Sequence, residues 1–164
     1  MLDKYFQKPV FWDYVLVSIL IIGLKILYYL DCITIPELEL LLSLSSDIAN
    51  VSFTSAGFII TLVTVIITFK SNSHVTKENY KESDTVFELF FASDLYYETV
   101  KHFKNCVKSL VIVAVVGYVL KLINHDLRCE FLFLYCSSGL LVILLSLWRC
   151  LLILSKIVKM QRQD

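Results

Sequence analysis

The sequence predicts an all-α membrane protein with four transmembrane helices, the third of which extends into the cytosol. Of the 164 residues, 57% are hydrophobic and only 18% are charged, and the mean hydropathy is +0.72. A soluble domain has about 25% charged residues, so this chain has too little polar surface to form a soluble globule. Basic and acidic residues balance at 15 each, so net charge does not indicate nucleic-acid binding.

Four apolar segments are long enough to cross a bilayer, which takes about 20 helical residues. They cover residues 10–30, 48–69, 106–123 and 131–154. We expect one transmembrane domain over residues 1–164, with a cytoplasmic segment, 71–105, between the second and third spans. The first span is predicted to be retained, because no small-residue cleavage site follows it.

The positions of the lysines predict the orientation. Lysines are concentrated in the head of the chain, in the 71–105 segment and in the tail. The charged residues of the loops predicted at 31–47 and 124–130 are mostly acidic. Because basic loops stay on the cytoplasmic side, both termini are predicted to be cytoplasmic.

The basic residues within the spans include Lys25, Lys121 and Arg149. Charges within a membrane often belong to an ion pathway or a gate. Long basic side chains near helix ends can instead extend their charged heads to the nearer membrane surface. The second interpretation is preferred, since each of the three lies near one end of its span.

The second span has a stripe of small and polar residues at alternating spacings of three and four, which we call the α-stripe: Asn50, Thr54, Gly57, Thr61, Thr64 and Thr68. Such a stripe either packs against neighbouring spans, as small residues do in lipid, or lines a polar pathway when several copies surround an axis. Packing is the preferred interpretation. It predicts that a bulky residue disrupts assembly at Gly57 but is tolerated at Ile59, on the opposite face.

The third helix is predicted to begin well before the membrane. Thr85 and Glu88 form a capping box, and a seam with the same spacing runs from Leu89 to Lys121. We therefore expect one helix over 85–123, about 58 Å long at 1.5 Å per residue.

The cytosolic part of this helix, 85–105, is rich in aromatic residues, namely Phe87, Phe90, Phe91, Tyr96 and Tyr97. They are either anchors at the membrane interface or a docking surface for a cytosolic protein. Acidic neighbours favour docking, because the inner leaflet is anionic and attracts basic residues. Replacing Phe90 and Phe91 by alanine is then predicted to leave insertion intact and to abolish partner binding.

No catalytic or metal-binding constellation is found in the sequence. The three histidines are scattered, and there is no phosphate-binding loop or nucleophile motif. We therefore predict a non-enzymatic protein with no catalytic, cofactor-binding or metal-binding residues. Cys32 and Cys129 both fall in the loops predicted to face outward, where they either form a disulfide or remain free thiols.

The four-span layout, the acidic outer loop and the second-span sequence SAGFIITLVTVIITFK resemble the KwaA-like membrane subunits of the bacterial Kiwa anti-phage defence system. The resemblance implies a homo-oligomeric sensor of phage infection in the bacterial inner membrane, which engages a cytosolic effector. We therefore expect a membrane sensor or scaffold that docks this effector through its 85–105 helix. The expected partners are membrane lipid, further copies of the chain and a cytosolic protein, with no direct nucleic-acid binding.

Two other functions fit the same layout. One is a pore-forming effector that depolarises the membrane when it is triggered. The other is a small accessory subunit of a channel or transporter. Leakiness of membranes to ions on expression of the chain separates the pore from the sensor.

Overall fold

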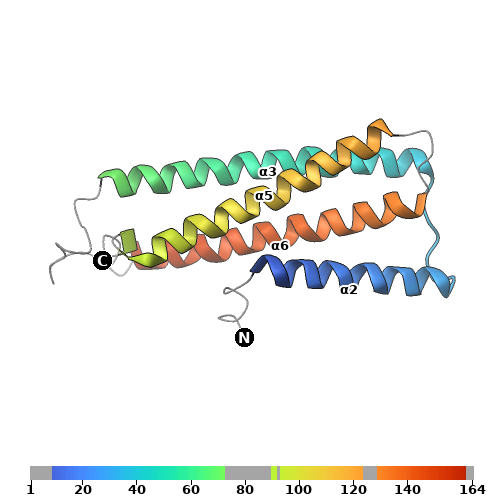
Figure 1. Ribbon diagram of the computed structural model, residues 1–164, viewed down its shortest axis with the longest axis horizontal. Helices are drawn as coiled ribbons and strands as arrows, with labels where there is room; N and C mark the ends of the chain where they lie inside the picture. The colour runs from blue at the N-terminus through green and yellow to red at the C-terminus, as the bar shows by residue number, and fades with distance from the viewer. Residues whose placement is uncertain (1–8, 73–89, 92, 124–128, 162–164) are drawn as a thin grey trace.

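The computed structural model describes residues 9–72, 90–91, 93–123 and 129–161. These residues form helices α2 (Pro9–Tyr29), α3 (Leu38–Asn72), α5 (Asp94–Leu122) and α6 (Cys129–Gln161). Successive helices run in opposite directions (Figure 1). The start of α2 therefore faces the end of the bundle where α6 finishes, although the shorter α2 stops well short of it (Figure 1). We call this the Pro9 end. The opposite end is called the Tyr29 end.

All four helices are long and apolar enough to cross a membrane, which confirms the predicted all-α, four-span architecture of a multi-pass membrane protein. Helix α2 has 21 residues and is about 31 Å long at 1.5 Å per residue, close to the ~30 Å of a bilayer core. Helices α3 and α6 have 35 and 33 residues, so both extend beyond the hydrocarbon layer.

Two predicted boundaries are wrong. Helix α3 begins at Leu38, so most of the loop predicted at 31–47 is helical. The reason is a leucine-rich run after Pro36, a residue that suits the chain just before a helix but not its interior. The predicted continuous helix over 85–123 is interrupted at Ser93, whose φ of −90° and ψ of 164° are extended.

Helix α5 therefore begins at Asp94, and the capping box at Thr85 lies outside the described residues. Aspartate at this position favours a helix start, because a negative charge suits the first turn. The Ser93 side chain makes no capping hydrogen bond to that turn. The Ser93 hydroxyl donates to the Phe90 carbonyl at 2.8 Å, which stabilises the turn before α5. This local signal outweighs the longer periodic seam.

Helices α3, α5 and α6 form the core of the bundle, and α5 crosses obliquely between the other two (Figure 1). Small residues allow α3 and α5 to approach closely. A Cβ atom added at Gly117 would lie 3.1 Å from the Cβ of Ala49, and the Ser45 hydroxyl donates to the Gly117 carbonyl at 3.4 Å. Close backbone approach through small residues is the usual way in which helices associate in lipid.

Helix α2 lies at the edge of the bundle and packs mainly on α6 (Figure 1). Among its described side chains, only Asp13 and Val17 are buried. Helix α2 is therefore the least anchored of the four, and one of its two buried side chains is charged.

Candidate functional site

The α-stripe lies on the outer face of α3, where all six of its residues are exposed. A Cβ atom added at Gly57 would meet nothing within 4 Å. Except at Asn50, whose side chain meets Tyr118 of α5, the interpretation that the stripe packs against neighbouring helices of the same chain is therefore wrong. Packing against another copy, or lining a pathway between copies, remains a prediction.

The hydroxyl groups of the four threonines in the stripe all bond to their own helix. Each donates to the carbonyl one turn earlier, at 2.9 to 3.1 Å. Asn50 accepts a hydrogen bond from the Tyr118 hydroxyl at 2.5 Å. The threonines of the stripe therefore face outward with their hydroxyl donors satisfied, as a surface exposed to lipid or to another helix requires.

The face of α3 that packs in the bundle is a second series of small and apolar residues: Leu41, Ser45, Ile48, Ala49, Ser52, Ala56, Ile59 and Ile66. Ile59 is fully buried, so the predicted tolerance of a bulky residue there is wrong. The sequence does contain a signal for this face. Ser45 with Ala49, and Ser52 with Ala56, are small residues four apart, a spacing typical of packed helices in membranes.

The predicted aromatic docking surface is mostly buried. Phe90, Phe91 and Tyr96 are 5%, 4% and 6% exposed, and the rings of Phe90 and Phe91 lie 5.2 Å apart, edge to face. Of the described members of the set, only Tyr97 is exposed, and Phe87 lies outside the described residues. The aromatic cluster thus closes the Pro9 end of the core, because these rings gain more by packing together than by facing water.

Lys70, near the end of α3, ties this aromatic cluster to α3. Its ammonium group lies 4.1 Å from the ring centroids of both Tyr96 and Tyr97. Cation–π contacts of this kind stabilise by about 0.5–1 kcal/mol at exposed sites. Because Phe90 and Phe91 are buried, replacing both by alanine would also disrupt the core, so a lost partner in this variant would not identify a docking surface.

Cys32 and Cys129 are both free thiols. No disulfide joins them in the part of the chain that the structure describes. Lys25 and Lys121 are exposed near the Tyr29 end, and the Lys121 ammonium group donates to the Ser46 hydroxyl at 3.1 Å.

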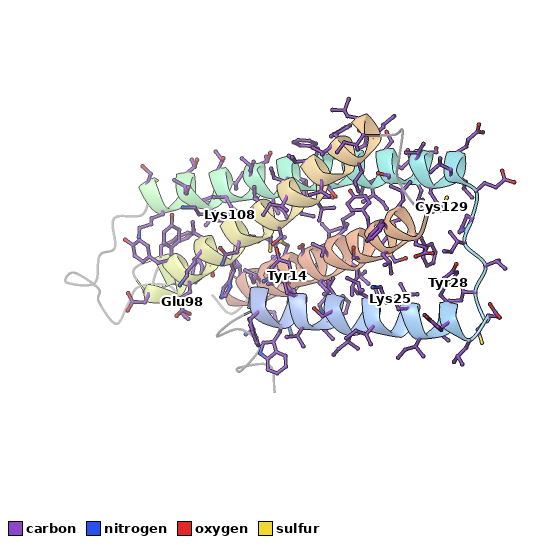
Figure 2. The ribbon with its side chains drawn as sticks, turned by 45° about the vertical axis from the view of Figure 1, so that its right-hand side comes forward. Tyr14, Lys25, Tyr28, Glu98, Lys108 and Cys129 are labelled. Atoms are coloured by element: carbon purple, nitrogen blue, oxygen red, sulfur yellow. The ribbon has the colours of Figure 1, made fainter. Side chains whose placement is uncertain are left out.

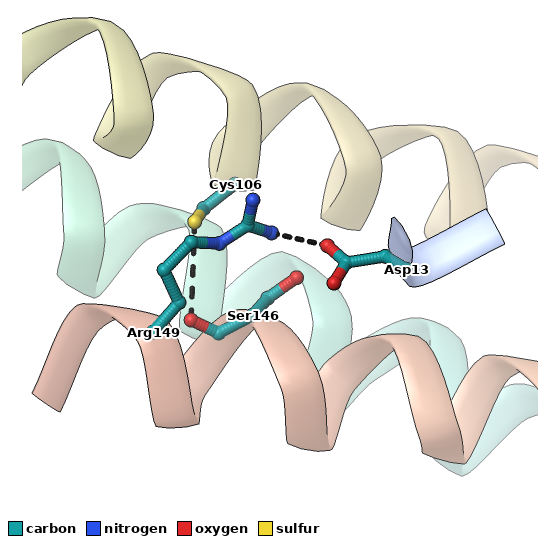
Figure 3. Close-up of polar contacts among 4 residues, drawn as sticks. All are labelled: Asp13, Cys106, Ser146 and Arg149. Carbon is teal, nitrogen blue, oxygen red and sulfur yellow. Dashed lines mark hydrogen bonds and ion pairs between the residues drawn. The ribbon is translucent and has the colours of Figure 1, made fainter. Parts of the chain in front are cut away.

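Arg149 behaves differently from the two lysines, and the prediction that it extends to the membrane surface is wrong. Its side chain is fully buried, and its Nη2 donates to the Oδ2 of Asp13 at 2.5 Å. Figure 3 shows Arg149 of α6 directed toward Asp13 of α2, with Cys106 of α5 beside it. Asp13 is the fourth residue after Pro9, so the pair lies about 6 Å along α2 from its start.

The guanidinium group is only partly satisfied. Among the described residues, Nε and Nη1 of Arg149 have no hydrogen-bond partner. Around it, the Cys106 thiol donates to the Ser146 carbonyl at 3.8 Å, and Cys150 lies beside Cys106. The site therefore joins α2 to α6 through a buried ion pair, and α5 to α6 through the Cys106–Ser146 hydrogen bond.

This arrangement provides an electrostatic latch. Both charges are strongly coupled because the surroundings are apolar, and separation of α2 from α6 would break the contact between them. Charged pairs within spans are by default functional candidates. Sequence reasoning missed Asp13 because it lies within a continuous apolar run, 136 positions from Arg149. The signal that remains is one acidic and one basic residue, each in the half of its span nearer the cytoplasmic side predicted for both termini.

In the residues that the structure covers, no group of three or more His, Cys, Asp or Glu side chains could hold a metal ion. No protein-family model matches the chain, and no curated protein or solved structure matches it. The resemblance to Kiwa membrane subunits therefore stays a prediction.

Proposed function

We propose that the chain is a non-enzymatic membrane sensor or scaffold of a bacterial anti-phage defence system, with both termini in the cytoplasm. In this proposal α2 is the element that moves in response to the stimulus. The observation that carries the proposal is the Asp13–Arg149 pair. Asp13 is buried, and Val17 is the one other buried residue among the described side chains of α2.

A sensor needs an element with two arrangements that differ by a few kcal/mol. Helix α2 meets this requirement, because little apolar packing holds it and the Asp13–Arg149 pair ties it to α6. Weakening the latch should shift the equilibrium toward the released arrangement, whereas apolar residues at both positions should hold α2 in place without a charge.

The test uses bacteria that express the chain together with its neighbouring genes and are challenged with phage. We expect fewer plaques with the wild-type chain than with an empty vector. Asp13→Asn should change this protection, and Asp47→Asn, an exposed aspartate on α3, should not. Equal plaque counts for wild type and empty vector would overturn the proposed function.

Self-association through the outward α-stripe is the second part of the proposal. The stripe is small or polar along α3 and leaves open space at Gly57, as a helix–helix contact between copies requires. Gly57→Leu should shift the purified protein toward monomers in detergent. Val65→Leu, on a neighbouring exposed face of the same helix, is the matched control and should keep the wild-type assembly.

The same outward stripe also favours a second candidate function, a pore formed between copies. Asn50 and the threonine hydroxyl oxygens can face a shared axis when several stripes meet. Ion leakage from liposomes that contain the purified chain tests this candidate. Leakage that Gly57→Leu abolishes and Val65→Leu retains would favour the pore over the sensor.

The proposed cytosolic effector needs a contact other than Phe90 and Phe91. The start of α5 offers one, since Leu95 and Tyr97 are 53% and 60% exposed at the Pro9 end. In a pull-down, Leu95→Ser should lose the effector while membrane insertion stays normal. A double variant that still brings down the same proteins, Leu95→Ser with Tyr97→Ser, would exclude this surface as the contact.

A further inference from the structure

A recess opens at the Tyr29 end, between the last turn of α2 and the first turns of α6. Its mouth measures about 530 Å³ and is lined by charged and phenolic side chains, among them Lys25, Tyr28, Asp31 and Glu130. A narrow apolar cleft of about 40 Å³ continues from it, between Leu24, Ile35, Phe133 and Leu134. Lys25, Tyr28 and Glu130 line both parts, so a polar mouth joins an apolar floor.

The backbone at the end of α2 holds the mouth in a defined shape. Asp31 has a φ of 53°, in the left-handed region. The Asp31 N–H bonds to the Tyr28 carbonyl at 3.1 Å, and the Cys32 N–H bonds to the Leu27 carbonyl at 3.1 Å. This pair of bonds is the Schellman motif, which ends helices. It fixes the Asp31 backbone beside the last turn of α2, where Lys25 and Tyr28 project toward α6 (Figure 2).

The depth of the recess matches the lipid headgroups. Helix α2 is about as long as the bilayer core is thick, so its last turn reaches the membrane surface. Tyr28 and Tyr29 lie in that turn, and tyrosine is enriched at the level of the headgroups. The apolar cleft then lies at the depth of the upper acyl chains.

The charges at the mouth are complementary to a headgroup with both signs. Lys25 supplies one ammonium group, and Asp31 and Glu130 supply two carboxylates. None of the three charged groups forms an ion pair or hydrogen bond with another side chain in the described part of the protein. A phosphate would bind Lys25, and a primary ammonium would donate charge-assisted hydrogen bonds to the carboxylates.

We propose that this recess binds one phospholipid whose headgroup carries a phosphate and a primary ammonium, that is, a phosphatidylethanolamine. Its phosphate contacts Lys25, its ammonium contacts Asp31 and Glu130, and one acyl chain lies along the apolar cleft. A phosphatidylglycerol lacks the ammonium. A phosphatidylcholine has a quaternary ammonium with no N–H to donate. The recess lies at the opposite end of α2 from the Asp13–Arg149 pair, so this site does not depend on the function proposed above.

The test is native mass spectrometry of the delipidated full chain, titrated separately with the three phospholipids. We expect one phosphatidylethanolamine to bind about tenfold more tightly than either of the others, the ratio set by one net charge-assisted hydrogen bond. Glu130→Gln combined with Asp31→Asn should remove this preference; asparagine also tolerates the left-handed backbone. Lys25→Gln should weaken binding of all three lipids.

Glu39→Gln is the matched control, because Glu39 is an exposed acid in the first turn of α3 at the same end of the bundle. It should bind phosphatidylethanolamine as the wild type does. Equal binding of the three lipids by the wild type would overturn the proposal. So would a loss of preference in Glu39→Gln as large as that in the recess variant. Neither result bears on phage protection, which tests the proposed function separately.

Discussion

Replacing Asp13 by asparagine should destabilise the bundle more than any other substitution of similar size in α2. The substitution keeps the size of the side chain and removes its charge. Arg149 cannot compensate for this loss, because its side chain is buried and its Nε and Nη1 have no partner among the described residues. Removing one member of a buried ion pair typically costs 3–5 kcal/mol. We expect Asp13→Asn to cost about that much.

The two tryptophans of the chain make this cost measurable. Trp12 lies in α2 and Trp148 in α6, so intrinsic fluorescence follows the unfolding of the two helices that the pair joins. Unfolding of the detergent-solubilised chain by increasing SDS gives the free energy of unfolding for each variant. Asp47→Asn, the same chemical change at an exposed position of α3, should stay within about 0.5 kcal/mol of wild type.

A double variant separates the charge from the contact. Asp13→Leu combined with Arg149→Met removes both charges and fills a similar volume. Such apolar replacements of buried pairs are often neutral or stabilising by about 1–4 kcal/mol. The double variant should therefore be more stable than Asp13→Asn. A cost for Asp13→Asn no larger than that of Asp47→Asn, or a double variant less stable than the single one, would refute the latch.

Three further results follow from the packing. Phe103→Ala should cost about 3–5 kcal/mol in the same SDS assay, because Phe103 is fully buried in the core. Gly117→Ala should cost about 1–3 kcal/mol, because the new methyl group meets the Tyr135 hydroxyl. Mild oxidation should join Cys106 to Cys150, because the two thiols lie side by side, with two protons and two electrons passing to the added oxidant. Peptide mass spectrometry should detect the disulfide, and its absence would contradict the α5–α6 register.

The number, type and order of the spans could be predicted from the sequence, because hydrophobic length alone determines which segments cross a bilayer. The packing seam of α6 was also predictable. Cys136, Gly139, Ile143, Ser146 and Cys150 recur at spacings of three and four, and all five are buried. Because α6 has one such series, the sequence identifies which face of α6 packs in the bundle.

Helix α3 shows why the same reasoning fails elsewhere. It has two series of small residues at the same spacing, one containing Gly57 and the other containing Ser45 and Ala56. In water the more polar series would face outward and settle the question. In lipid, threonine can face either way, because its hydroxyl bonds to its own backbone, as Thr54, Thr61 and others do here. Polarity therefore does not separate the two faces, and only the shape of the partner helices does.

The latch could not be predicted for a different reason, which also bears on how it works. Considered by itself, Arg149 is a charge near the end of a span, and a long basic side chain there can extend its head to the membrane surface. Burial becomes the better solution only when a carboxylate from another helix is available, and Asp13 supplies it from α2. The position of Arg149 thus depends on where α2 lies. If α2 moves away, Arg149 loses its counter-ion, and the solution open to it is then the one that local rules suggest, with its head at the membrane surface. Movement of α2 would in this way be converted into a movable positive charge at the Pro9 end, where the buried aromatic cluster and the exposed start of α5 also lie.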